Sequence, residues 1–164
     1  MKTFRLSRSM LFAGLLSLSL SFASHAWACK YDFSYTSSSE VRDIISDPDL
    51  SSPSVSTADC QRLNRFTPFL KTHHIDFSIT ADHFVNSGVS VAWATARLQD
   101  QYGITSSFSG VVTRVRADPD DAVARQLTKY AATESIFNLD LPGALANLRK
   151  TEIKDGLEPI PALP

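Results

Sequence analysis

Three histidines are the first side chains to weigh for catalysis or metal binding. His73, His74 and His83 lie within eleven residues, with Asp76 and Asp82 beside them. Imidazole and carboxylate groups bind zinc and similar metals, and they also act as general acids and bases. However, about nine residues of a predicted strand separate His73 from His83, which is roughly 30 Å when extended. Two interpretations stay open: a metal or acid–base site, or a polar helix-to-strand loop with a histidine at the far strand end.

Sequence motifs of the common enzyme classes are absent from the chain. It has no G-x-S-x-G, H-E-x-x-H, P-loop, G-x-G-x-x-G or C-x-x-C sequence. We therefore assign no catalytic, cofactor-binding or metal-binding residue and expect no cofactor. A metal-assisted hydrolase that uses His73, His74 or His83 with a nearby aspartate is kept as an alternative hypothesis.

A row of polar side chains follows the histidine pair. Asp76, Ser78, Thr80 and Asp82 alternate with apolar residues from Ile75 onward, so one strand face is expected to be buried and the other wet. The polar row is either a surface for a partner or an ordinary solvent-facing side. Arg114 and Arg116 are expected to extend this face with opposite charge, and each cross-strand pair contributes well under about 1 kcal/mol.

Other aromatic and basic residues receive simpler interpretations. Trp93, Tyr102 and Phe108 are expected to pack in the core or in turns rather than to bind a ligand. Arg62, Arg65 and Lys71 are expected to form a solvated helix face.

The elements that would position these side chains follow from hydrophobic periodicity. Residues 30–58 are polar and Ser-rich, with a short helix near 39–46. A second helix begins at Ser56 with a capping-box pattern and is expected to stop or kink near Phe66 or Thr67, because Pro68 follows.

Strands and two further helices follow. A period of two over residues 75–117 predicts a three-stranded antiparallel meander, with a three-residue turn at 86–88, a turn at 100–103 and the strand at 89–98 in the centre. A helix capped by Asp118 then runs to about Phe137, and Asp140 is expected to cap a last helix with Pro142 in its first turn. The fold class is α+β: a two-layer domain over 29–150 in the order α-α-β-β-β-α-α, with a flexible tail at 151–164.

The first 28 residues have the pattern of a secretory signal peptide. Lys2, Arg5 and Arg8 precede an apolar run over residues 10–22, and the small-x-small sequence of residues 26–28 ends just before Cys29. A 13-residue helix spans about 20 Å, which is too short for the roughly 30 Å core of a bilayer. Cleavage is predicted after Ala28, although two earlier small-x-small sites stay open. The mature chain is then periplasmic or secreted, without a membrane span.

The two cysteines are assigned from this location. An oxidising compartment favours a disulfide, and two cysteines allow only the pair Cys29–Cys60. In the chain-entropy model, closing this loop stabilises the fold by roughly 3–4 kcal/mol. Two alternatives stay open: lipidation of Cys29 with Cys60 as a thiol, or two buried thiols.

Composition excludes several functional classes. The chain has 164 residues, of which 43% are hydrophobic and 20% charged, with a net charge of −1. These values exclude a disordered chain, and they give no electrostatic reason for a nucleic-acid partner. After residue 28 the chain has 13 basic and 17 acidic residues. An exported, non-enzymatic binding protein of the bacterial envelope is the favoured hypothesis, either an inhibitor or an immunity protein that acts on another protein. A structural or accessory envelope component is a further alternative.

Overall fold

The computed structural model of the chain describes residues 35–45 and 54–163, and these residues form one α+β domain. The elements, in chain order, are β1 (Tyr35–Thr36), α1 (Ser39–Ile45), α2 (Thr57–Thr72), β2 (Asp76–Asn86), β3 (Val89–Gln99), β4 (Gly110–Arg116), α3 (Asp121–Phe137) and α4 (Leu141–Lys154). The predicted signal peptide 1–28 and Cys29 lie outside the described residues. None of the helices in the described ranges is long and apolar enough to cross a membrane.

The sheet has four strands rather than the three predicted, in the order β1-β2-β3-β4. β2, β3 and β4 form the expected antiparallel meander, with β3 in the interior. β1 adds a parallel edge, with Tyr35 opposite Phe77 and Thr36 opposite Ser78. The predicted element order is therefore corrected at its start, where a strand precedes α1. A strand of two residues is too short to show an alternation of apolar and polar residues, so the sequence of the Ser-rich segment did not indicate β1.

The turn between β2 and β3 is tighter than predicted. Asn86 pairs with Val89, so only Ser87 and Gly88 form the loop. Gly88 has φ +113, a conformation open to glycine and strained for residues with a Cβ. The expected left-handed glycine is therefore present, but in a two-residue rather than a three-residue turn.

α2 begins where the sequence predicted and ends later. Ser56 Oγ accepts the N–H of Asp59 at 3.2 Å, and the Asp59 carboxylate accepts the N–H of Ser56 at 3.1 Å. Of the predicted stop or kink near Phe66 or Thr67, the stop is wrong, because the helix continues through Pro68 to Thr72. Proline removes one bond to the carbonyl four residues earlier, that of Asn64. Both residues are exposed, so water can satisfy the freed carbonyl.

The residues that begin α3 and α4 agree with the prediction only in part. The carboxylate of Asp120, not of Asp118, accepts the N–H groups of Ala122 and Val123 and begins α3. Asp118 instead offers its carbonyl to the hydroxyl of Ser90 on β3, at 2.5 Å. α4 begins after Asp140 with Pro142 in its first turn, as predicted, but the Asp140 side chain makes no capping hydrogen bond.

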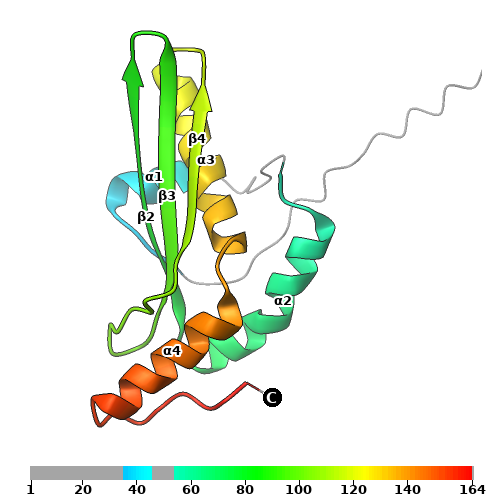
Figure 1. Ribbon diagram of the computed structural model, residues 1–164, viewed down its shortest axis with the longest axis vertical. Helices are drawn as coiled ribbons and strands as arrows, with labels where there is room; N and C mark the ends of the chain where they lie inside the picture. Colours follow the sequence, from blue (N-terminus) through cyan, green and yellow to red (C-terminus); the bar gives the residue numbers. More distant parts are fainter. Residues whose placement is uncertain (1–34, 46–53, 164) are drawn as a thin grey trace, which may run out of the picture.

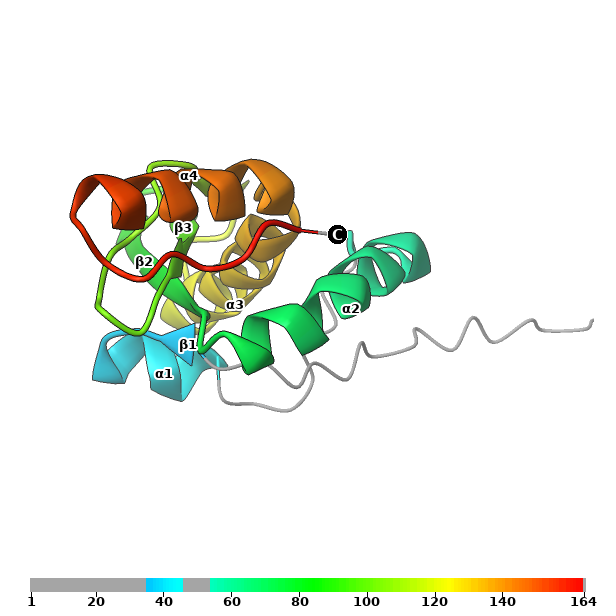
Figure 2. The same ribbon diagram turned by 90° about the horizontal axis from the view of Figure 1, so that it is seen from below.

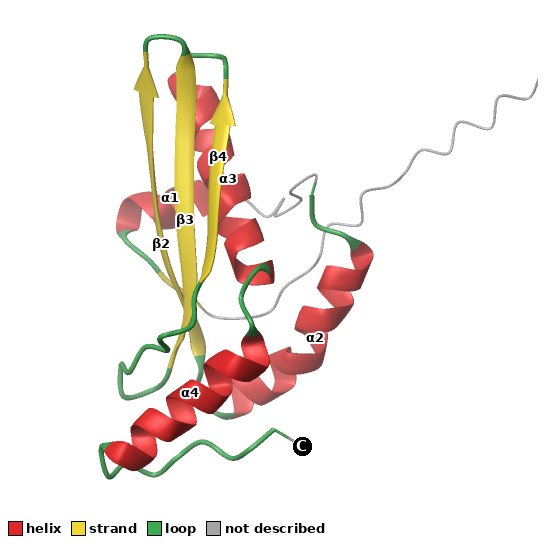
Figure 3. Ribbon diagram, viewed as in Figure 1, coloured by secondary structure: helices red, strands yellow, loops and turns green. Residues whose placement is uncertain are grey.

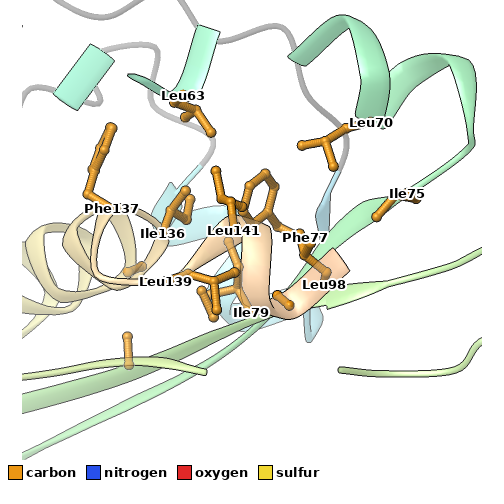
Figure 4. Packing of buried hydrophobic residues seen from close by; sticks show 14 of the residues in the cluster. Leu63, Leu70, Ile75, Phe77, Ile79, Leu98, Ile136, Phe137, Leu139 and Leu141 are labelled. Atoms are coloured by element: carbon orange, nitrogen blue, oxygen red, sulfur yellow. The ribbon is translucent and has the colours of Figure 1, made fainter. Parts of the chain in front are cut away.

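The core lies between the sheet, α3 and the ends of α2 and α4. Figure 1 shows β2, β3 and β4 in front of α1 and α3, and Figure 3 shows the same two layers as strands and helices. Small side chains allow α3 to approach the sheet closely: Ala92, Ala94 and Ala96 on β3, and Ala124, Ala131 and Ala132 on α3, all with no exposed surface. Larger side chains such as Leu63, Phe77 and Leu141 fill the space where α2 and α4 meet the sheet (Figure 4).

The C-terminal segment differs from the flexible tail predicted over 151–164. Residues 151–154 belong to α4, and the chain then turns back along that helix (Figure 2). Ile160 is 7% exposed and belongs to the core cluster, and Leu163 packs against that cluster. The absence of periodicity in this segment reflects an irregular backbone, which periodicity cannot distinguish from a loose one.

Candidate functional site

The side of the sheet opposite α3, which we call the open face, carries the polar row and an apolar group together. Three cross-strand rows make up its part near the β2–β3 turn: Phe84–Val91–Val115, Asp82–Trp93–Thr113 and Thr80–Thr95–Val111. Ser78 pairs with Arg97 and Asp76 with Gln99 further along. The predicted polar row is thus on one face, beside apolar residues that the sequence placed elsewhere.

The predicted position of the two arginines is wrong. Arg114 pairs with Ala92 and Arg116 with Ser90, and both of these β3 partners are buried on the side that α3 covers. Arg114 forms an ion pair with Glu134 of α3, with Nε 2.8 Å from Oε2, and its Nη2 donates to Ser54 Oγ at 2.6 Å. Arg114 and Arg116 therefore do not extend the polar row.

The close approach of α3 explains this orientation of β4. A Cβ on Gly110 would lie 1.9 Å from the carbonyl oxygen of Ser135, so only glycine fits where β4 begins. The Gly110 side of β4 faces α3, and alternation then places Val111, Thr113 and Val115 on the open face. The arginine at 114 reaches the carboxylate of Glu134, a residue that is 7% exposed.

An apolar cluster results on the open face, and we call it the open-face patch: Phe84, Val91, Trp93, Val111 and Val115. Their exposed fractions include 53% for Phe84, 57% for Val111 and 62% for Val115. Trp93 is 36% exposed, so it does not pack in the core as predicted. Tyr102 and Phe108 are also exposed, in the loop between β3 and β4. In Figure 1 the sheet lies in front of α3, so the open face is on the viewer's side.

The histidines are not brought together. His73 caps the C-terminus of α2, with its ring centroid 4.5 Å from that of Phe69, and His74 has φ +51 in the following turn. His83 lies in the distal half of β2, with Nε2 3.7 Å from Asp121 Oδ1. Among the residues that the structure describes, no three His, Cys, Asp or Glu side chains form a group able to hold a metal ion.

The basic residues of α2 are only in part a solvated face. Arg65 and Lys71 are exposed, but the guanidinium of Arg62 donates to the carbonyl of Phe137 at the end of α3. Arg62 also lies 3.8 Å from Asp59. Hydrogen bonds from Ser56, its backbone N–H included, and the nearby Arg62 hold the pKa of the Asp59 carboxyl below its usual range.

Cys60 lies in the first half of α2 and is half-buried. It is not a free thiol. Because Cys29 is outside the described residues, the pairing of Cys29 with Cys60 stays a prediction.

Buried acids are the side chains that the sequence analysis missed. Glu134 is 7%, Asp100 6% and Glu152 0% exposed. Burial raises the pKa of Glu152, a hydrogen bond from the Ile160 N–H opposes this rise, and the neighbouring Asp100 carboxyl adds to it. A signal existed for Glu152, because the apolar spacing of Leu145 and Leu148 continues at its position four residues later.

Comparisons with known proteins identify no relative: no family model, curated protein or solved structure matches the chain. The function is therefore inferred from the described surface. The open-face patch offers apolar contacts, and Asp82 and the threonines beside it on the open face offer hydrogen bonds.

Proposed function

We propose that the chain is an exported, non-enzymatic binding protein of the bacterial envelope that holds a partner protein against the open face of its sheet. An inhibitor or immunity protein is the form of binding protein that we favour. The observation that carries the proposal is the open-face patch, in which three strands together present aromatic and valine side chains to solvent.

Contiguity is what separates this patch from ordinary exposed apolar residues. Single apolar side chains on a surface are common, but groups of neighbours usually mark an interaction site. Phe84 and Val115 both flank Val91 in one cross-strand row, and Trp93 is central in the next row. Tryptophan and other aromatic residues are enriched among the side chains that dominate binding energies at protein interfaces.

The polar surroundings indicate the chemistry of the partner. Asp82 of β2 pairs with Trp93 of β3, and Asp76 lies at the other end of β2. Beside the patch, Thr113 lies in the cross-strand row of Trp93, and Thr80 and Thr95 lie in the row of Val111, so all three supply hydroxyl groups to the open face. The fitting partner is a protein with an apolar centre and basic side chains placed to meet the β2 carboxylates. The excess of acidic residues after residue 28 favours the same charge complementarity during association.

Export is supported by the sequence of the first 28 residues and by the state of Cys60. A positively charged start, a short apolar run and small residues before Cys29 are the three parts of a secretory signal. A Cys60 that is not a free thiol is in keeping with an oxidising compartment. The intact mass of the purified protein tests this part. We expect the loss of residues 1–28 and of two protons, and a full-length chain with two thiols would contradict export.

Site-specific photocrosslinking in the producing cell tests the surface. A photoreactive amino acid at position 111 or 115 is expected to capture one and the same protein. At position 153 of α4 it is expected to capture none, although Ile153 is similarly exposed at 56%. Equal capture from all three positions would show general stickiness and refute the assignment. Capture of a second copy of the chain would instead make the face a homodimer interface.

Affinity measurements with the captured partner give the quantitative test. Val115→Lys places a charge in the patch, and we expect at least a tenfold loss of affinity, which corresponds to about 1.4 kcal/mol. Ile153→Lys is the matched control and is expected to bind as the wild type does. Both substitutions are at exposed positions, so unfolding temperatures should stay within a few degrees of the wild type. If the partner is an enzyme, loss of its activity in the complex distinguishes an inhibitor from an accessory component.

A further inference from the structure

Two buried carboxyl groups meet where the loop after β3 lies against α4. Oδ1 of Asp100 accepts the N–H groups of Tyr102 and Ile104 at 2.9 and 2.8 Å. Oε2 of Glu152 accepts the N–H of Ile160 at 2.7 Å. The other two oxygens, Oδ2 of Asp100 and Oε1 of Glu152, are shielded from solvent and receive no hydrogen from any group in the described part of the chain.

One proton satisfies both oxygens. Two acceptors cannot bond to each other while both carboxyls are ionised, and two like charges in a buried site repel strongly. With a proton on Glu152, its O–H donates to Asp100, and the interaction between these two side chains is among the causes that raise the pKa of Glu152. The same arrangement is known in acid pairs that share a proton in other proteins.

We propose that a proton shared between Asp100 and Glu152 fastens the C-terminal segment, residues 155–163, to the domain. We call this segment the strap. Its direct link is the bond from the Ile160 N–H to Glu152, and the Leu157 N–H adds a bond to the Glu152 carbonyl at 2.9 Å. Figure 2 shows the strap running back along α4. When the proton leaves, the strap lifts and admits water to the two carboxylates.

Lifting the strap changes the surface of α4. Leu145, Ile153 and other α4 side chains line a hollow of about 270 Å³ together with strap residues that include Pro161 and Leu163. Removing the strap takes Ile160 out of the core and bares the apolar side of this hollow. The proton therefore decides whether the chain presents an apolar helix surface at this end, away from the open-face patch.

The other charged groups nearby face solvent. On the far side of Asp100, a polar hollow is lined by Lys71 and His74 at the end of α2 and by Asp76 of β2. On α4, Arg149 and Lys150 are exposed, as are Asp155 and Glu158 of the strap. Water and salt screen these groups, so the pair itself dominates the response. Because the folded chain holds the proton more tightly than the unfolded chain, the contribution of the pair to stability is lost as pH rises through the raised pKa of Glu152.

Thermal unfolding between pH 5 and pH 9 tests the proposal. Glu152→Gln replaces the shared proton permanently, because the amide nitrogen can donate to Asp100 while the amide oxygen accepts the Ile160 N–H. We expect wild-type Tm to fall relative to this variant by about 3 °C or more as pH rises, because the wild type loses the bridging proton while the variant keeps its amide donor. Glu158→Gln, an exposed carboxyl in the strap, should follow the wild type. Parallel curves for wild type and Glu152→Gln would overturn the proposal.

Asp100→Asn gives a second route to the same result, since its amide nitrogen can donate to Glu152 while its oxygen keeps the two backbone bonds. It should also flatten the pH response. Hydrogen exchange at Ile160 reports on the strap itself. In the wild type its protection factor should fall by up to tenfold per pH unit as pH rises to the raised pKa of Glu152 and level off above it, whereas in Glu152→Gln it should stay level throughout. If a chelator lowers wild-type Tm at high pH, a bound cation rather than a proton joins the carboxyls, and the proposal is wrong.

Discussion

Gly110→Ala is expected to be the most destabilising removal of a glycine in the described domain. A Cβ at this position would lie 1.9 Å from Ser135 O, 2.7 Å from Leu139 N and 3.0 Å from Asn138 C. All three are backbone atoms at the end of α3 or in the link to α4, so no side-chain rotation relieves the clash. Overpacking of a core by a methyl group costs typically 1–3 kcal/mol, and a backbone obstacle places this case at the upper end, about 3 kcal/mol.

Gly143→Ala supplies the matched control. The nearest atoms to its added Cβ are Asp140 Oδ2 at 2.3 Å and Phe108 Cε1 at 2.9 Å, both in side chains. The Asp140 side chain makes no capping bond, and Phe108 is 43% exposed, so both can move. Alanine also favours a helix over glycine by about 1 kcal/mol. The free energy of unfolding of Gly143→Ala should therefore stay within about 1 kcal/mol of the wild type.

Urea unfolding followed by circular dichroism measures both variants, with thermal unfolding as a second measurement. A loss of about 3 kcal/mol corresponds to a decrease in Tm of roughly 6–12 °C for a domain of this size. If Gly110→Ala is as stable as Gly143→Ala, α3 does not press on the start of β4. The explanation of why Arg114 points to α3 and Val115 away from it would then fail.

Three further substitutions test local features by the same unfolding measurements. Asp59→Asn weakens the capping box with Ser56, so we expect a loss of about 0.5 kcal/mol at pH 7; the difference should disappear as pH falls through the lowered pKa of Asp59. Arg114→Met removes a guanidinium from the buried carboxylate of Glu134 and should cost about 2 kcal/mol, more than Glu134→Gln, which keeps the shape and removes the buried charge. Gly88→Ala meets no atom within 4 Å, but φ +113 should still cost about 1 kcal/mol.

Local chemistry made much of the fold predictable. The capping box at Ser56 and the Asp140–Pro142 start of α4 depend only on neighbouring residues, and both are present. The alternation that begins at Ile75 predicted β2 because one side of that strand is buried and the other wet. These features satisfy backbone donors or bury a periodic face within a few residues of sequence, so the sequence alone contains the information.

Features set by distant partners were missed. The parallel pairing of β1 with β2 joins Tyr35 to Phe77, and no local pattern records such a contact. The continuation of α2 through Pro68 leaves the Asn64 carbonyl without its helical donor, at a residue that is exposed to water. The meeting of Glu152 with Asp100, 52 positions away in the chain, also has no local signal, although the burial of Glu152 itself does. In each case the feature depends on a contact with a distant part of the chain or with water, which a local sequence pattern does not record.

The orientation of β4 shows why the open-face patch escaped prediction and why it matters. A strand with valines on one side and arginines on the other normally buries its valines, and the local pattern favours that result. Here the buried alanines of β3 and the close approach of α3 at Gly110 leave no room for larger side chains at the start of β4. Val111 and Val115 therefore face solvent. Each Å² of apolar surface that stays in water loses about 25 cal/mol of the stabilisation that burial would give. A partner protein that covered these side chains, as we propose, would recover that free energy on binding.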